Sequence, residues 1–194
     1  KYRTKYVELP VEGLRTRVRF PPPPPDTQSQ PFVVGIFFIC NGFRKTRIMT
    51  IFTIGYEGLG VDAFMSLLVA HGVDTLIDVR ELPLSRKPGF SKKALANVLQ
   101  TSGREYIHIV ELGCPKPIRN QYRADGDWQR YTKGFLKHLK TQDDAIIRLS
   151  SLVASTNCAL LCYEADANFC HRSMVADAVK AHCGARVSHI RGYC

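Results

Sequence analysis

The chain contains 194 residues, of which 45% are hydrophobic, so it is long and apolar enough to bury the core of one globular domain. Its formal net charge is +10, but residues 1–48 hold 9 basic and 3 acidic residues, whereas residues 49–194 hold 18 and 14. The second part is therefore only mildly basic, and the overall charge is weak evidence for nucleic-acid binding.

The seven cysteines are odd in number and lack the paired spacing of a disulfide framework, which predicts free thiols in a reducing compartment. No C-x-x-C motif occurs, which argues against a zinc knuckle or a thioredoxin-type site. The apolar run Phe32–Cys40 is too short to span a bilayer, and it follows a proline run that does not resemble a signal peptide. We therefore expect a cytoplasmic protein without a membrane segment.

Residues 1–48 differ in character from the rest of the chain. Five consecutive prolines, Pro21–Pro25, exclude helix and sheet and favour an extended polyproline segment. Such a segment is either a ligand for an aromatic groove or a disordered extension. A third interpretation is translated upstream DNA, because Arg15–Pro22 is what the T-arm of a transfer-RNA-like gene would encode, most similar to the 3′ end of a transfer-messenger RNA. We favour this third interpretation, with Met49 as the native first residue.

From Met49 onward, short apolar runs alternate with segments whose apolar residues recur at helical spacing, which predicts alternating strands and helices. We expect strands at 51–54, 73–79, 105–110, 158–163 and 186–190, and helices at 61–71, between Ser91 and Gly103, at 128–140, at 142–154 and from 170 onward. The connections 80–90 and 111–127 are expected to be long loops. This order predicts one α/β domain over 49–194, with a mostly parallel, Rossmann-like, doubly wound sheet and helices on both faces.

Six short motifs lie where predicted strands end, in a following loop or where a helix begins. In chain order they are TIGY (53–56), DVR (78–80), PLSR (83–86), ELG (111–113), CYE (162–164) and CHRS (170–173). Their identity and order resemble the family catalogued as domain of unknown function 488, over roughly Thr50 to Ile190. The resemblance implies the α/β fold and a site built from these motifs. It implies no reaction, so the chemistry has to be inferred from the residues.

The ends of parallel strands meet at one edge of a sheet, so the residues that follow the predicted strands are expected to lie together. The helix that begins at residues 170–172 adds free N–H groups and positive potential at this edge. We expect substrate binding by Tyr56, Asp78, Arg80, Ser85, Arg86 and Arg172, and catalysis by Cys170, Glu111, Glu164 and His171. Several arginines facing a helix N-terminus favour a phosphate or carboxylate ligand.

Two interpretations of Cys170 stay open. It is a nucleophile if the helix start and the neighbouring His171 and Arg172 stabilise a partly exposed thiolate. Alternatively, Cys170 is structural, Glu164 or Glu111 is the general base or nucleophile, and the arginines hold phosphate.

Three further patterns have competing interpretations. The Asp78–Arg80 and Glu164–Arg172 pairs are either ligand-binding groups or ion pairs that tie loops together. Residues 122–137 interleave aromatic and basic side chains, which is typical of a nucleic-acid groove but more often of an ordinary helix face. Metal binding by Cys162, Cys170 and His171 is a third option, but their spacing matches no standard zinc site. We therefore predict no metal and no cofactor.

Together these features favour an enzyme, a hydrolase or transferase, that acts on a phosphate-bearing nucleotide or nucleic-acid substrate. The alternative is a non-catalytic module that binds a nucleotide or nucleic acid. A phosphate-bearing ligand is the expected partner, with nucleic acid as one candidate.

The interpretation of residues 1–48 can be tested directly. A chain that begins at Met49 is expected to express and fold, and its thermal unfolding midpoint should match that of the full chain, because residues 1–48 show no periodic apolar face for a core. Differential scanning calorimetry of both chains provides the measurement. A midpoint lower by several degrees in the shorter chain would contradict the interpretation.

Overall fold

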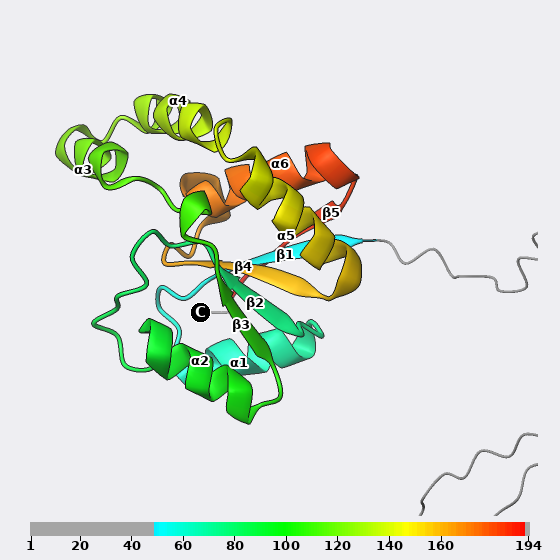
Figure 1. Ribbon diagram of the computed structural model, residues 1–194. Helices are drawn as coiled ribbons and strands as arrows, with labels where there is room; N and C mark the ends of the chain where they lie inside the picture. The colour runs from blue at the N-terminus through cyan, green and yellow to red at the C-terminus, as the bar shows by residue number, and fades with distance from the viewer. Residues whose placement is uncertain (1–48, 193–194) are drawn as a thin grey trace, which may run out of the picture. The chain divides into compact units, whose positions relative to one another are not determined.

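The computed structural model describes residues 49–192, and in this range five strands form one parallel sheet (Figure 1). The strands are β1 (Thr50–Gly55), β2 (Thr75–Asp78), β3 (Glu105–His108), β4 (Cys158–Cys162) and β5 (Arg186–Ile190), and their order across the sheet is β3-β2-β4-β1-β5. Every neighbouring pair is parallel. The predicted α/β class is therefore confirmed, whereas the predicted extension over residues 1–48 lies outside the described residues.

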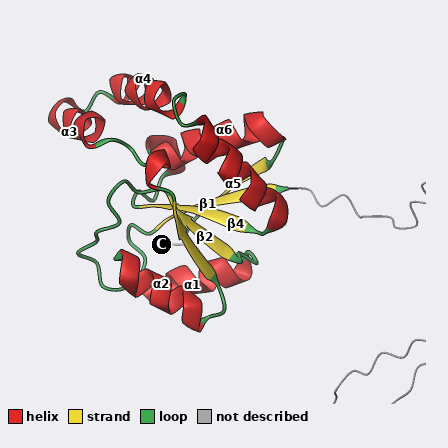
Figure 2. Cartoon of the chain, viewed as in Figure 1, coloured by secondary structure: helices red, strands yellow, loops and turns green. Residues whose placement is uncertain are grey.

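Helices cover both faces of the sheet (Figure 2). They are α1 (Val61–Ala70), α2 (Lys92–Thr101), α3 (Lys116–Asp125), α4 (Trp128–Leu139), α5 (Asp143–Ser155) and α6 (His171–Cys183). The helices α1 and α2 lie on one face and α5 and α6 on the other, while α3 packs on α4 and α4 contacts α6. None of the helices in residues 49–192 combines the length and the apolar content that a bilayer crossing requires.

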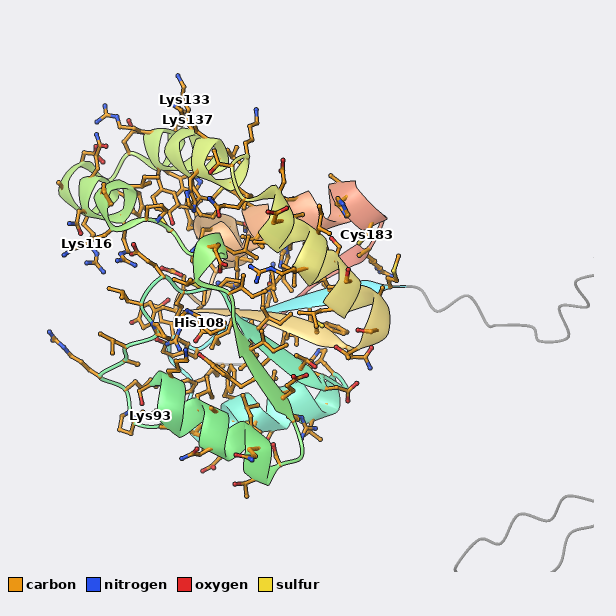
Figure 3. All side chains as sticks on the ribbon, in the orientation of Figure 1. Lys93, His108, Lys116, Lys133, Lys137 and Cys183 are labelled. Atoms are coloured by element: carbon orange, nitrogen blue, oxygen red, sulfur yellow. The ribbon has the colours of Figure 1, made fainter. Side chains whose placement is uncertain are left out.

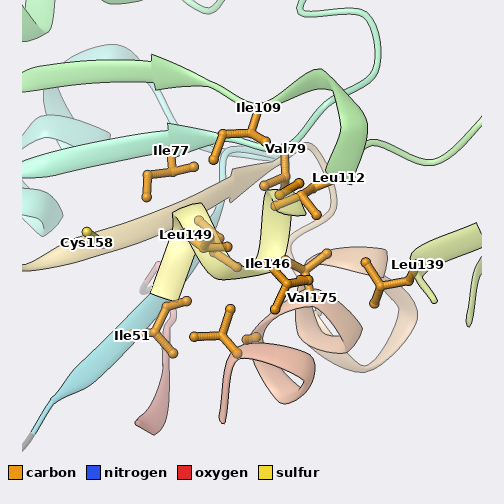
Figure 4. Packing of buried hydrophobic residues seen from close by; sticks show 14 of the residues in the cluster. Ile51, Ile77, Val79, Ile109, Leu112, Leu139, Ile146, Leu149, Cys158 and Val175 are labelled. Carbon is orange, nitrogen blue, oxygen red and sulfur yellow. The ribbon is translucent and has the colours of Figure 1, made fainter. Parts of the chain in front are cut away.

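The alternation of side chains along each strand divides the core into two clusters, one on each face of the sheet. On one face, Ile54 and Leu161 belong to a buried cluster with Phe64 and Leu95 of α1 and α2. On the other face, residues of β1, β2 and β4 pack against α5 and α6, and Figure 4 shows Ile51, Ile77, Cys158, Leu149 and Val175 among them. Fully buried strands of this kind account for the continuous apolar runs in the sequence.

The prediction of a long loop over residues 111–127 is wrong. This segment contains α3, and a short 3₁₀ helix, Val110–Leu112, precedes it. Pro115 and Pro117 suggested a loop, but they occupy the N-cap and second positions of α3. A backbone N–H at these positions has no acceptor within the helix, so proline is tolerated there. A second 3₁₀ helix, Ala167–Phe169, lies in the connection between β4 and α6.

The connections of β1 and β4 create a crevice at the C-terminal edge of the sheet. These strands are neighbours, yet β1 leads to α1 on one face and β4 leads to α6 on the other. In open α/β sheets, ligands bind where neighbouring strands send their connections to opposite faces. The end of β4 and the start of α6 therefore mark the expected position of a site.

Gly55 allows the chain to turn closely over the end of β1. It pairs in register with Cys162, and a Cβ at this position would lie 1.8 Å from the carbonyl oxygen of Glu164. Any side chain at residue 55 would therefore displace the backbone that follows β4.

Replacing two glycines by alanine is expected to change stability in opposite directions. Gly55→Ala should lower the free energy of unfolding by about 2–3 kcal/mol through overpacking. Gly134→Ala should raise it by about 0.5–1 kcal/mol, because this position is inside α4 and its Cβ would meet Ile118 at an ordinary 3.6 Å. Urea unfolding of both variants is the measurement, and equal effects would contradict the close packing at Gly55.

Candidate functional site

A cavity of about 910 Å³ opens at the C-terminal edge of the sheet, beside the ends of β1, β2 and β4. Its walls come from the segments that follow these strands and from α3 and α4. Residues that line it include Tyr56, Arg80, Ser85, Arg86, Lys87, Arg119, Tyr122, Arg123, Trp128, Cys162, Tyr163, Glu164, Phe169 and His171. The sequence argument that residues after the strands share one edge is thus supported for most of the predicted positions.

Four residues of this edge, Cys162, Glu164, Cys170 and His171, form a compact group that we call the Cys–Glu–His cluster. The thiols of Cys162 and Cys170 both donate to Oε2 of Glu164, at 2.9 and 3.0 Å. The Nδ1 atom of His171 lies 3.6 Å from the sulfur of Cys162, and its Nε2–H donates to the carbonyl of Val79 at 2.8 Å. One ligand atom from each of the four side chains lies within 4.8 Å of the others, so the cluster is a set of possible metal ligands.

Local structure explains why these side chains converge. Cys162 is the last residue of β4, Cys170 is the N-cap residue of α6, and His171 is its first helical residue. The intervening turn is closed by Asp166, whose Oδ1 accepts from the N–H of Asn168 at 2.9 Å. The turn therefore brings residues 162 and 170 back to the same point at the sheet edge.

A family model described as domain of unknown function DUF488 matches residues 60–179. The chain belongs to this family. The resemblance inferred from the six motifs is thereby confirmed. No curated protein and no solved structure is significantly similar to the chain. The family description names no reaction, so the chemistry of this DUF488 domain has to come from its geometry.

Burial and hydrogen bonds together set the protonation of the cluster in the DUF488 domain. Burial raises the pKa of the Cys170 thiol well above its ordinary value and also raises the pKa of the Cys162 thiol. Burial alone would raise the pKa of Glu164 too, but the hydrogen bonds from the two thiols outweigh it and lower that pKa. At neutral pH the proton-free group is therefore the carboxylate of Glu164.

The prediction of a partly exposed thiolate at Cys170 is wrong. Only 1% of this residue is exposed, and its S–H donates to Glu164. The sequence placed a cysteine at a helix start, which lowers a thiol pKa only when the group is accessible and paired with positive charge. Here desolvation by the surrounding core has the larger effect.

A second buried group, centred on Asp78 and Arg80, joins four segments: the ends of β1 and β2, the loop before α2, and β3. Both carboxylate oxygens of Asp78 accept from the guanidinium of Arg80, which also donates to the hydroxyl of Tyr56 at 2.9 Å and to the carbonyl of Phe90 at 3.0 Å. The hydroxyl of Tyr106 donates to Asp78 at 2.6 Å. Every partner of Arg80 is internal, so its contacts are those of a structural tie, and its predicted role in substrate binding stays a prediction.

Two other predicted residues lie apart from the cavity surface. Arg172 is 1% exposed and donates to the backbone carbonyls of Glu164 and Ala165. Glu111 does not line this cavity, because it lies in the 3₁₀ helix after β3 and pairs with Arg148 at 2.8 Å. The expected Glu164–Arg172 ion pair does not form, because this arginine binds the backbone of residue 164 rather than its carboxylate.

The sequence did not predict that aromatic side chains form one wall of the cavity. Trp128 of α4 stacks on Tyr131, contacts Tyr122 of α3 edge-on and meets Phe169 at a centroid distance of 5.5 Å. Two basic residues of α4 lie on another face of this helix. Figure 3 shows Lys133 and Lys137 pointing outward, away from the sheet. Helical spacing places the aromatic and the basic side chains on different faces. The alternation of aromatic and basic residues in 122–137 was visible in the sequence, but it did not show which face meets the cavity.

Two conservative carboxylate changes are expected to differ in their effect on stability. Asp78→Asn should lower the free energy of unfolding by about 3–5 kcal/mol, because it leaves the guanidinium of Arg80 buried without its counter-charge. Glu111→Gln should change it by about 1 kcal/mol or less, since the pair with Arg148 is exposed. Urea unfolding followed by circular dichroism is the measurement. Similar losses in both variants would contradict the structural role of Asp78.

Proposed function

We propose that this DUF488 domain is an enzyme that acts on a phosphate-bearing nucleotide or nucleic-acid substrate in the cavity at the C-terminal edge of the sheet. The observation that carries the proposal is one cavity in which aromatic and basic side chains form the wall beside the proton-free carboxylate of Glu164. Each part suits one part of a nucleotide.

The aromatic groups suit a nucleobase. Phe169 is 56% exposed and Tyr163 48% exposed, and both line the cavity together with Trp128. Exposed aromatic faces stack on bases with little dependence on sequence, at about 1–3 kcal/mol per base. Large apolar side chains are otherwise costly to leave in water, which supports a ligand for this wall.

The basic groups suit a phosphate. Arg86, Lys87 and Arg123 line the cavity, and none of them forms an ion pair with another residue in the range 49–192. Arg119 is different, because its guanidinium binds Glu81 at 2.7 Å. Arginines that keep their donors free at a cavity wall favour phosphate oxygens, which accept two parallel hydrogen bonds.

The carboxylate of Glu164 supports catalysis over simple binding. It lines the cavity, accepts two thiol hydrogen bonds and forms no ion pair with a described residue, so its charge is not consumed by an arginine. A proton-free carboxylate in a partly water-excluded site is suited to activating water or a hydroxyl as a general base. The alternative, a non-catalytic binding module, would keep the wall and need no such group.

A reducing compartment such as the cytoplasm fits the proposal. Cys162 and Cys170 are thiols that form no disulfide, and both act as hydrogen-bond donors to Glu164. Oxidation of these thiols would remove those bonds, so the site depends on reducing conditions.

Binding of a fluorescent single-stranded oligonucleotide tests the wall. Phe169→Ala should weaken binding by about 1–3 kcal/mol through lost stacking. Arg86→Ala should weaken it for all sequences and reduce the slope of log affinity against log salt by about one phosphate contact. Lys93→Ala is the matched control for charge, because this exposed lysine lies on α2, on the other side of the sheet from Lys133 and Lys137 (Figure 3). Fluorescence anisotropy at several salt concentrations is the measurement, and equal weakening by the Arg86 and Lys93 variants would contradict a phosphate site in the cavity.

Turnover distinguishes the enzyme from the binding module. The wild type is incubated with nucleotides and oligonucleotides, and products are sought by mass spectrometry. Glu164→Gln should abolish product formation while oligonucleotide affinity stays within about twofold, because the wall is unchanged. Tight binding by the wild type without any product would overturn the enzyme proposal in favour of the binding module.

A further inference from the structure

We propose that the Cys–Glu–His cluster binds a zinc ion, with Cys162, Cys170 and His171 as fixed ligands and Glu164 as the fourth. The cluster presents two sulfurs, one imidazole nitrogen and one carboxylate oxygen, all within 4.8 Å of one another. Two thiolates and an imidazole are ligands that prefer zinc over magnesium or calcium.

One of the three distances between ligand atoms matches a tetrahedral site, and the other two are slightly shorter. With metal–ligand bonds of about 2.0–2.3 Å, two ligands of one tetrahedral zinc lie about 3.3–3.8 Å apart. The Cys162 sulfur lies 3.6 Å from Nδ1 of His171, and Oε2 of Glu164 lies 2.9 and 3.0 Å from the two sulfurs. Moving the ligands apart by less than about 1 Å would open space for the ion, and staggered side-chain rotations provide such shifts.

The second nitrogen of His171 has the partner that a zinc ligand requires. Its Nε2–H donates to the carbonyl of Val79 at 2.8 Å, so Nδ1, which faces Cys162, is the nitrogen available to a metal ion. Metal-bound imidazoles nearly always donate their other N–H to a carbonyl or carboxylate, which fixes the ring orientation. The anchor lies on the segment after β2, so the ring is held by the sheet edge.

The charge of the surroundings is also suited to the ion. Two thiolates and one carboxylate exceed the charge of a divalent ion by one negative charge. Arg172, the residue after His171, is 1% exposed and forms no ion pair with any residue in 49–192. Its guanidinium donates to the backbone carbonyls of Glu164, which is the carboxylate ligand, and of the next residue, Ala165. A buried cation without a counter-ion is costly, and a metal site with one excess negative charge supplies that counter-ion.

The position of the ion indicates a catalytic site. Cys162, Glu164 and His171 line the cavity, so an ion held by them would face a bound substrate. Four protein ligands close the site, and water or a substrate oxygen would enter it in place of the carboxylate of Glu164, which leaves the three fixed ligands typical of catalytic zinc. The inference deepens the proposed function and shares Glu164 with it, but zinc content and oligonucleotide binding are measured separately.

Zinc content tests the inference. The full chain is produced without a polyhistidine tag, kept reduced, equilibrated with Zn²⁺ and dialysed, and its zinc is measured by plasma mass spectrometry. We expect about one zinc per chain, and at least a tenfold lower content in Cys162→Ser and Cys170→Ser. Cys183→Ser is the matched control, because this cysteine lies at the other end of α6 and donates to the carbonyl of Val179 (Figure 3). It should keep the wild-type content.

Cobalt provides a readout that does not depend on the folding of a variant. Co²⁺ added to the reduced wild type should give the thiolate-to-cobalt charge-transfer absorption and tetrahedral visible bands, and Zn²⁺ should displace it. A wild type with native circular dichroism that retains no zinc, or that shows no thiolate–cobalt absorption, would overturn the inference. So would an equal zinc loss in Cys183→Ser.

The two proposals fail in different ways. If the protein binds the oligonucleotide but holds no zinc, the proposed metal site is wrong and the proposed function stands. A zinc-loaded protein that binds no oligonucleotide or nucleotide would remove the proposed function and leave the metal site.

Discussion

The buried guanidinium of Arg172 holds the site together. It donates to the carbonyls of Glu164 and Ala165 and reaches the hydroxyl of Thr53 at 3.4 Å, so it joins α6, the turn after β4 and β1. The turn can approach β1 this closely only because residue 55 is glycine. These two constraints fix the backbone of residue 164 and direct its carboxylate toward the two thiols. Loss of either would release the whole turn.

The arginines of the C-terminal sheet edge divide into two kinds according to burial. Arg80 and Arg172 are buried, and their donors bind internal carbonyls, hydroxyls and Asp78. Neither guanidinium can bind a phosphate without leaving those partners, which would cost several kcal/mol for a buried charge. Arg86 and Arg123 are exposed at the cavity and have no described ion-pair partner. An anion is therefore expected at the outer wall rather than at the start of α6.

The sequence was sufficient for the order along the chain of the strands and of every helix except α3, because buried parallel strands leave apolar runs and the other helices leave a clear period. It also predicted that Cys162, Glu164 and His171 share an edge, since this follows from parallel topology alone. It failed where a decision depends on side-chain direction. Glu111 follows β3 as expected, but a 3₁₀ turn buries the neighbouring Leu112 and sends the carboxylate to Arg148. Likewise, proline positions that suggested a loop belong to the first turn of α3.

The proposed zinc site could not be predicted from the spacing of its residues either. Standard zinc spacings come from tight knuckles, whereas here seven residues separate Cys162 from Cys170, and the turn that they form returns the chain to its starting point. Spacing alone could not show this return, because it depends on Arg172, Gly55 and the cap at Asp166. Sequence patterns therefore exclude a metal site only for the loop geometries from which they were drawn.

The hydrogen bonds of the cluster also bear on the two interpretations of Cys170, and they favour the structural one. A nucleophilic cysteine needs an accessible thiolate, but the proton of Cys170 is held against a carboxylate in a desolvated position. If a zinc ion replaces the two thiol protons, the sulfurs become ligands and are again withdrawn from attack on a substrate. In the metal-free cluster the two thiols hold the carboxylate by hydrogen bonds, and the atom left to accept a substrate proton is an oxygen of Glu164. The chemistry of this domain is therefore expected to depend on Glu164, with Cys170 as a positioning residue.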